Sequence, residues 1–391
     1  MTGVRPRIAV TGVGAISALG VGCDAYVEAL LAGACGLTPL GGFDLEPFVG
    51  RYSGEIRALD LAVRCGGGGE LDRFTQLALI AAQEAVSDSA LLDREPPPPR
   101  RLALVMATCN GGLLSAERHY RMLHGQEPGA LDEDLERAKR HYSAALALAG
   151  RFGVGGPITT VVTACSASTN AIGLGADLLR AGRADAVLVG GADSFSLTTF
   201  SGFDRLRTTS ASPCAPFSTP TGLNLGEGAG FWVLEREDRA LARGAAPRGF
   251  VLGYGLSNDA HHATLPDPRG QGLSACLERA VADAAVPRES IGYVNAHGTG
   301  TEANDKTESR VLGRFFEAPP PVSSTKSQIG HTLGAAGILE ATAGLLCLDR
   351  GQLPPTVNFT GPREACPLDY VPNRPRATGA TRFLASNSAF G

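Results

Sequence analysis

Lysine is nearly missing from this chain: Lys139, Lys306 and Lys326 are the only three among its 391 residues. Arginine carries almost all of the positive charge, and glycine is frequent with 51 residues, a bias that we attribute to genomic base composition. In such a background, a lysine that persists suggests a specific need for a compact ammonium group.

Long apolar runs and a strong net charge are missing too. No stretch of 18 apolar residues occurs, so no membrane-spanning helix is expected, and the opening MTGVRPRIAV lacks the pattern of a signal peptide. The formal net charge of −4 gives no reason to expect a nucleic-acid partner. With 43% hydrophobic and 19% charged residues, the composition is typical of a soluble globular enzyme, which we expect in the cytoplasm.

No two cysteines are spaced as C-x-x-C, and their number, nine, is odd. Both facts argue against a metal site and against a disulfide framework. Eight of the nine are interpreted as small buried hydrophobic residues. The exception is Cys165, because a β-branched apolar run, PITTVV, precedes it and a glycine- and alanine-rich helical run follows it. Cys165 is therefore predicted to lie where a strand turns into a helix.

The order of predicted elements occurs twice. In residues 1–248, a strand with a glycine turn, a long amphipathic helix, a second strand and the corner at Cys165 follow one another. In residues 249–391, a strand and turn over 249–259, a helix, a further strand and a second strand–helix corner repeat that order. The repeat predicts an α/β protein of two similar halves, with polar corner residues around one shared cleft.

Two histidines occupy corners of the second half that correspond to strand ends of the first. His297 follows a strand in NAHGTGT, and His331 follows one in TKSQIGHTLGAAG, five residues after Lys326. The remaining histidines lack such settings: His119, His124, His141, His261 and His262. A helix N-terminus lowers the pKa of a thiol, and a sharp elbow frees a backbone N–H for an oxyanion hole. Cys165 is therefore a candidate acyl-accepting nucleophile.

Four stretches together resemble a known family: TACSAS, NLGEGAGFWVLE, NAHGTGTEANDKTE and SSTKSQIGHTLGAAG. The chain resembles a β-ketoacyl-[acyl-carrier-protein] synthase of the elongating Cys-His-His kind, in the thiolase-like superfamily, from Val10 to Gly391. The resemblance implies a thiolase-like α/β fold, in which two similar halves form a layered αβαβα core. It also implies an acyltransferase that performs a decarboxylative Claisen condensation with malonyl-acyl-carrier protein.

The resemblance implies a catalytic role for four residues. Cys165 would take the acyl chain as a thioester. His297 and His331 would surround the malonyl thioester carbonyl and promote the loss of carbon dioxide, because imidazole N–H donors stabilise charge on an enolate oxygen. Lys326 would hold the second histidine and the polar network around it.

Five further residues match supporting or substrate positions of the family. Asp305 and Glu308 would tie the polar network together, and Thr299 and Thr301 would contact the phosphopantetheine arm. The backbone N–H of Phe390, in SNSAFG, would be the second oxyanion donor, on a gate loop. No metal and no cofactor is implied apart from that arm, which belongs to the carrier protein.

Two departures from the family pattern concern the substrate side. The gate loop reads NSAFG, and the family continues through a further strand, so we expect that the sequence given ends short of that strand. Asn224 stands where many relatives have a bulky apolar residue, and we expect it to bear on the shape of the substrate pocket.

Three alternatives share the fold. A thiolase uses a second cysteine as base, and none follows Cys366; a starter-type synthase has asparagine in place of His331; a non-extending partner subunit lacks the cysteine. These features favour the condensing enzyme, with the thiolase and the partner subunit as alternatives. Fatty-acid, polyketide and polyene pathways use the same residues, so the pathway stays open.

The expected partners are an acyl carrier protein and a second subunit. The resemblance implies a homodimer, or a heterodimer with a chain-length-factor-like subunit, and the apolar strands ALVMATC and ADAVLVGG suggest a core that continues across a two-fold axis. Two arginine pairs are candidates for docking an acidic carrier protein, or are simply solvated charges: Arg100 with Arg101, and Arg205 with Arg207.

Overall fold

The computed structural model describes residues 5–57, 59–66, 71–93, 96–129 and 132–390, so the outer limits of the two predicted halves, residues 1 and 391, lie outside it. None of the helices in these ranges is long and apolar enough to cross a membrane.

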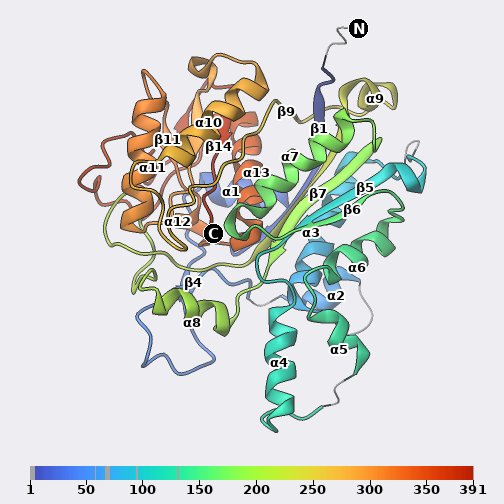
Figure 1. Cartoon of the computed structure of the whole chain (residues 1–391), viewed down its shortest axis with the longest axis horizontal. Helices are drawn as coiled ribbons and strands as arrows, with labels where there is room; N and C mark the ends of the chain where they lie inside the picture. Colours follow the sequence, from blue (N-terminus) through green and yellow to red (C-terminus); the bar gives the residue numbers. More distant parts are fainter. Residues whose placement is uncertain (1–4, 58, 67–70, 94–95, 130–131, 391) are drawn as a thin grey trace.

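A seven-stranded sheet forms the centre of the first half (Figure 1). Its strands are β1 (Ile8–Ser17), β2 (Gly20–Val21), β5 (Leu102–Ala107), β6 (Ile158–Val161), β7 (Ala186–Asp193), β8 (Gly228–Arg236) and β9 (Gly249–Val251). They follow the order β2-β1-β8-β7-β5-β6, with β9 also paired to β1. Strands β7, β5 and β6 run parallel, and β8 joins β7 to β1 by antiparallel pairing.

A smaller sheet forms the second half and repeats part of this order. It consists of β10 (Tyr293–Asn295), β11 (Val322–Ser323) and β14 (Phe383–Ala385). All three strands are parallel, in the order β11-β10-β14, which corresponds to β6-β5-β7 in the first sheet. The predicted internal repeat is therefore visible in the strand order.

Helices pack in three layers around these sheets (Figure 1). The main ones are α3 (Arg73–Ser89), α6 (Ser143–Phe152), α7 (Ala167–Arg180), α10 (Gln271–Ala284), α11 (Glu302–Phe315) and α13 (Ala336–Asp349). Helices α3 and α6 cover one face of the first sheet, α7 and α13 lie between the two sheets, and α10 and α11 cover the second sheet. The layered αβαβα core of a thiolase-like fold is thereby confirmed.

The approach of α3 to β1 depends on two glycines. A Cβ atom at Gly12 would lie 2.1 Å from the Ala85 carbonyl oxygen, and one at Gly14 would lie 2.0 Å from the Ala81 carbonyl oxygen. Both distances are shorter than any real contact, so β1 can lie against α3 only with glycine at these positions.

The remaining elements are short or peripheral. They are α1 (Cys23–Leu31), α2 (Leu61–Cys65), α4 (Leu113–Leu123), α5 (Glu133–Ala138), α8 (Leu197–Arg205), α9 (Glu237–Ala242), α12 (Lys326–Ile329), β3 (Thr38–Pro39), β4 (Tyr52–Ser53), β12 (Gln352–Leu353) and β13 (Arg376–Ala377).

The first strand of the second half joins the first sheet. A strand and a turn were expected over residues 249–259; the strand is short, Gly249–Val251, and it pairs with β1. In the first half, β8 fills the position between β7 and β1; in the described part of the second half, β14 pairs with β10 alone, and residues 252–259 have no ladder partner. Without that partner the segment lacks the hydrogen bonds that define a strand. The predicted division after residue 248 stays a prediction.

Candidate active site

Cys165 lies on a strained elbow between β6 and α7. A short 3-10 turn, Ala164–Ser166, joins them, and Ala164 has a φ of +47°, which an L-residue with a Cβ atom rarely adopts. The second half repeats this geometry: Leu333 has a φ of +53° and opens the turn Leu333–Ala335 before α13. The two elbows contact each other, so the thiol and the residues before α13 meet in the interior.

His331 lies directly against the cysteine. Its Nε2 is 3.0 Å from Cys165 Sγ, and both side chains are buried. The Leu333 backbone N–H donates to Nδ1 of the same ring over 3.3 Å. Because an imidazole nitrogen that accepts a hydrogen bond carries no proton, the neutral ring must carry its proton on Nε2. His331 therefore presents an N–H donor at the sulfur.

His297 follows β10 and faces the same space. Its ring lies edge-on to that of His331, with 5.4 Å between the ring centroids. Nδ1 of His297 lies 3.3 Å from Lys326 Nζ, and an ammonium group can only donate. The proton of neutral His297 is therefore also on Nε2, so both histidines offer an N–H donor.

Lys326 differs from its expected contact. The resemblance implied that it holds the second histidine, His331, but its hydrogen bond goes to His297. The physical reason is its ion pair with Glu340, a buried carboxylate on α13 that draws the ammonium towards the first histidine. Asn387 donates to the other oxygen of Glu340 over 2.6 Å, so the carboxylate is held from two sides.

The pKa values of the site are governed by burial. Burial raises the pKa of the Cys165 thiol to about 12, while the nearby Lys326 charge opposes this increase. The expectation that the helix N-terminus lowers this pKa is therefore not met in the resting site, where desolvation is the larger effect. Burial, together with the Lys326 charge, also holds the pKa values of His297 and His331 well below their usual range, so both rings are neutral at neutral pH.

Asp305 and Glu308 bind the backbone of loops around the site. Glu308 accepts from the backbone N–H groups of His297 and Gly298, over 2.7 and 2.8 Å. Asp305 accepts from the Phe217 N–H over 2.6 Å and pairs with Arg363 over 3.1 Å. The role that the resemblance implies for them, in the network around Lys326 and the second histidine, stays a prediction.

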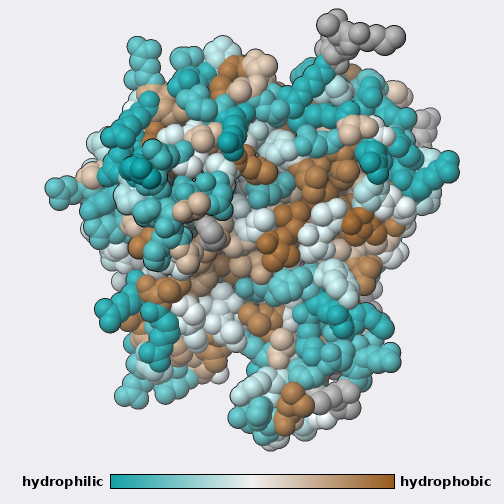
Figure 2. Space-filling model, viewed as in Figure 1, coloured by the Kyte–Doolittle hydropathy of each residue, from teal (hydrophilic) through white to brown (hydrophobic). Residues whose placement is uncertain are grey.

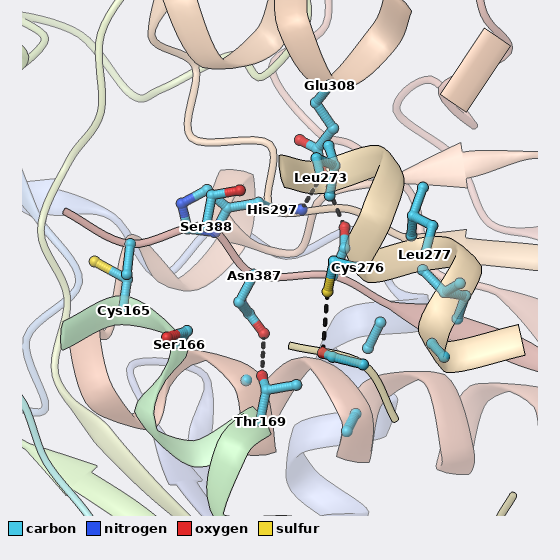
Figure 3. A pocket seen from close by; sticks show the side chains of 18 of the residues that line it. Cys165, Ser166, Thr169, Leu273, Cys276, Leu277, His297, Glu308, Asn387 and Ser388 are labelled. Atoms are coloured by element: carbon cyan, nitrogen blue, oxygen red, sulfur yellow. Dashed lines mark hydrogen bonds between the residues drawn. The ribbon is translucent and has the colours of Figure 1, made fainter. Parts of the chain in front are cut away.

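A cavity of about 1330 Å³ joins the predicted site residues. Seven of the nine line it: Cys165, His297, His331, Thr299, Thr301, Glu308 and Phe390. Lys326 and Asp305 do not line it. Figure 3 shows Cys165 on one side of the space, with His297, Asn387 and Ser388 across from it. The cavity continues between β14 and residues 252–258, at the position without a ladder partner.

The two threonines and the gate residue Phe390 line the cavity, whereas Asn224 does not. The hydroxyl oxygens of Thr299 and Thr301 lie 2.8 Å apart on the cavity wall. The Phe390 ring stacks on Phe203 with 5.4 Å between centroids, and the oxyanion role of its N–H stays a prediction. Asn224 does not line the cavity; instead its carbonyl accepts from the His331 N–H over 2.8 Å.

Three polar residues near the site were missed by the sequence analysis: Glu340, Asn387 and Asp193. Glu340 had a detectable signal, since it is the one charged residue within GILEATAGLL, a run that is otherwise apolar except for Thr342. Asp193 ends the apolar strand β7 in the same way. Asn387 had no signal beyond its place in the gate loop.

Comparisons with known proteins show which family the chain is similar to. The family models described as "Beta-ketoacyl synthase, N-terminal domain" and "C-terminal domain" match residues 5–240 and 248–360. The chain is 33% identical over 400 residues to 3-oxoacyl-[acyl-carrier-protein] synthase 2 of Synechocystis, covering 99% of this chain and 96% of that protein. It is 35% identical over 406 residues to the tetracenomycin polyketide synthase ketoacyl synthase alpha subunit of Streptomyces glaucescens, covering 98% and 95%.

Among solved structures, the ishigamide ketosynthase/chain length factor superposes on the chain with a TM-score of 0.92. The two are 35% identical in sequence, and the match covers 99% of this chain and 97% of the other. The agreement in fold therefore extends over nearly the whole chain.

Proposed function

The chain belongs to the β-ketoacyl synthase family, and from this premise we propose that it is an elongating ketosynthase that extends an acyl chain on Cys165 with malonyl-acyl-carrier protein. One observation carries the proposal: the Cys165 sulfur lies 3.0 Å from one Nε2–H donor, with a second such donor, on His297, facing the same cavity. This arrangement suits a covalent acyl intermediate followed by an enolate.

The first step transfers the acyl chain to the enzyme. The Cys165 sulfur attacks the thioester of an acyl-carrier protein, a C–S bond forms, and the thiol of the phosphopantetheine arm leaves with the proton. The raised pKa of Cys165 means that this proton departs during the step rather than before it.

The second step forms and uses the enolate. The bond between Cα and the carboxylate of the malonyl thioester breaks, carbon dioxide leaves, and the electron pair remains as an enolate. Its oxygen would accept from the Nε2–H groups of His297 and His331. The α-carbon then attacks the acyl thioester, the new C–C bond forms, and Cys165 leaves as a thiolate that regains a proton. This sequence calls on no metal or redox cofactor.

The wider assignments follow from the same premise. We propose that the substrates arrive on the phosphopantetheine arm of an acyl carrier protein, past Thr299 and Thr301, in fatty-acid, polyketide or polyene synthesis in the cytoplasm. Among the two arginine pairs, Arg207 is the better candidate for docking the carrier protein, since it is exposed and lines the cavity. Arg101 instead pairs with Asp185 over 2.6 Å.

The direct test of the proposal is a single condensation. The protein is mixed with a carrier protein that bears an acyl chain and with malonyl-carrier protein labelled in the carbons that are retained after decarboxylation. The masses of the products are then measured by mass spectrometry. A β-ketoacyl-carrier protein two carbons longer is expected. Acylation without any extended product over a range of chain lengths would refute the proposal.

Replacement of Lys326 by arginine is expected to remove most condensation activity while the fold survives. Lys326 is 1% exposed and fits between Glu340 and His297, and a planar guanidinium is wider than the ammonium it replaces. Displacing His297 by about 1 Å can cost roughly 100-fold in rate. The measurement is product formation beside circular dichroism. Lys306→Arg, at an exposed pair with Glu302, is the matched control and should retain full activity.

Decarboxylation is expected to be flat in pH between about 6.5 and 8. The pKa values of His297 and His331 are lowered, so both rings stay neutral through this range, and their protonation would interfere only as the pH falls further. The measurement is carbon dioxide release by Cys165→Gln, in which the thiol cannot contribute. An acid limb with an apparent pKa near 6.5 would contradict the assignment.

We propose that β6 is the edge at which a second subunit docks. Figure 2 shows apolar surface where α7 and β6 reach the exterior, and Ile158 and Val162 are 42% and 48% exposed there. Light scattering at micromolar concentration should show a dimer of the chain or a heterodimer with a homologous subunit. Ile158→Lys should weaken the association of the two subunits, whereas Leu241→Lys, on α9, should not. A fully active monomer would contradict the prediction.

A further inference from the structure

Asp193, the last residue of β7, is a buried carboxylate that the proposed mechanism does not use. It has no exposed surface, and four donors surround it. Oδ1 accepts from the Thr108 hydroxyl over 2.7 Å and from the Asn110 N–H over 2.9 Å. Oδ2 accepts from the N–H groups of Cys109 and Gly334, both over 2.7 Å.

These donors come from both halves of the chain. Thr108, Cys109 and Asn110 follow β5 in the first half, whereas Gly334 belongs to the second elbow, just after Leu333. The second half has a counterpart, since Glu308 accepts the two backbone N–H groups that follow β10. Asp193 therefore does for the corner after β5 what Glu308 does at His297, and in addition it reaches the opposite elbow.

The elbow that Asp193 holds is the one that sets the proton position of His331. Leu333 has an unfavourable φ of +53°, which neighbouring contacts must maintain. Its N–H donates to Nδ1 of His331, and the next N–H, that of Gly334, is bound by Asp193. No side chain would fit at Gly334, where a Cβ atom would lie 2.5 Å from the Cys109 nitrogen and 2.6 Å from Asp193 Oδ2.

We propose that Asp193 is a positioning residue for the decarboxylation step: by binding the Gly334 N–H it fixes the elbow that keeps His331 in its Nε2–H form. The inference rests on the proposed function, because the N–H donor matters only if His331 stabilises an enolate. Burial raises the pKa of Asp193 to about 6, which shows that its hydrogen bonds offset only part of the cost of burial. The presence of a carboxylate despite this cost of burial is consistent with a need for a hydrogen-bond acceptor next to the Gly334 N–H.

Two substitutions separate hydrogen-bond acceptance from charge. Asp193→Ala removes the acceptor at Gly334. Asp193→Asn removes the charge but leaves one oxygen, which can stay with Cys109 and Gly334 while the amide N–H₂ turns to the Thr108 hydroxyl, the one neighbour able to accept. The Asn110 N–H loses its acceptor in this variant, whereas the Gly334 bond is kept. Thr108→Val is the matched control, because it removes a donor from Asp193, together with the acceptor of the Gly111 N–H, and leaves the Gly334 bond in place.

The readouts are the ring ¹⁵N shifts of His331, identified by their loss in His331→Gln, and the two half-reactions. In Asp193→Ala we expect a mixture of His331 tautomers, decarboxylation slower by on the order of 100-fold, and acylation of Cys165 within about threefold of the parent. The KM for malonyl-carrier protein should not change. Asp193→Asn and Thr108→Val should keep the Nε2–H tautomer and near-normal decarboxylation.

Each outcome decides one of the two proposals. If the parent protein does not decarboxylate malonyl-carrier protein, the proposed function fails, whereas the tautomer measurement still tests the role of Asp193. An unchanged His331 spectrum in Asp193→Ala overturns the inference. If Asp193→Ala does not fold, Asp193→Asn decides: retention of the tautomer supports the hydrogen bond, and loss of it shows that charge is what matters and overturns the inference.

Discussion

Cys165→Gln is expected to abolish chain extension while carbon dioxide release from malonyl-carrier protein continues at the parental rate or faster. The substitution removes the sulfur that must carry the acyl chain, and loss of a nucleophile costs on the order of 10⁴-fold or more. It leaves both Nε2–H donors, because their tautomers are set by Lys326 and by the Leu333 N–H rather than by the thiol.

A physical reason makes glutamine preferable to alanine at this position. Its amide can occupy the buried corner next to His331 as the carbonyl of an acylated cysteine would, and it cannot react further. The variant should therefore resemble the acyl-enzyme, the state in which decarboxylation is productive. Intact-protein mass reports acylation, and labelled malonyl-carrier protein reports carbon dioxide release.

A second cysteine on the same cavity provides the matched control. Cys276 on α10 lines the cavity and donates to the Gly255 carbonyl over 3.0 Å, a bond that serine can replace. Cys276→Ser should therefore extend chains normally. Continued extension by Cys165→Gln, or loss of extension in Cys276→Ser, would show that the nucleophile has been assigned to the wrong residue.

The sequence predicted the parts of the site that depend on local pattern. A β-branched strand followed by a small-residue helix marks an elbow wherever it occurs, so Cys165 and the corner at His331 could both be found. The histidine after β10 could be found for the same reason, because glycine-flanked corners after buried strands are readable from spacing. The repeat of these patterns also predicted two similar halves.

The parts that depend on contacts between residues on different elements of the fold could not be predicted. Lys326 and Glu340 are 14 residues apart and on different elements, and only their packing shows that the lysine serves His297 rather than His331. Asp193 meets Gly334 across 141 residues. The pKa of Cys165 could not be predicted for the same reason. The sequence indicates the helix N-terminus, which lowers the pKa of a thiol, but not the burial, which raises this pKa by more.

His297→Ala is expected to have the opposite effect to Cys165→Gln: Cys165 still becomes acylated, but little enolate forms. His297 contributes one of two N–H donors to the enolate oxygen, and removing one such donor costs on the order of 3 kcal/mol, or roughly 10²–10³-fold in rate. Acylation should survive because the hydrogen bond at the sulfur comes from His331, which His297 does not hold.

The lower decarboxylation rate expected for His297→Ala must be distinguished from an indirect effect of a displaced Lys326. Without the imidazole, Lys326 keeps its ion pair with Glu340, so the buried charge stays compensated and the fold should persist. His297→Asn restores an N–H donor on a shorter side chain and should recover part of the decarboxylation rate, whereas His261→Ala, in an exposed loop, should change nothing. Both half-reactions are measured on each variant. If His297→Ala releases carbon dioxide at the parental rate, the enolate is stabilised by another group. If His297→Ala fails to become acylated, His297 acts in the first step. Either result would show that the roles assigned to the cysteine and the histidines are wrong.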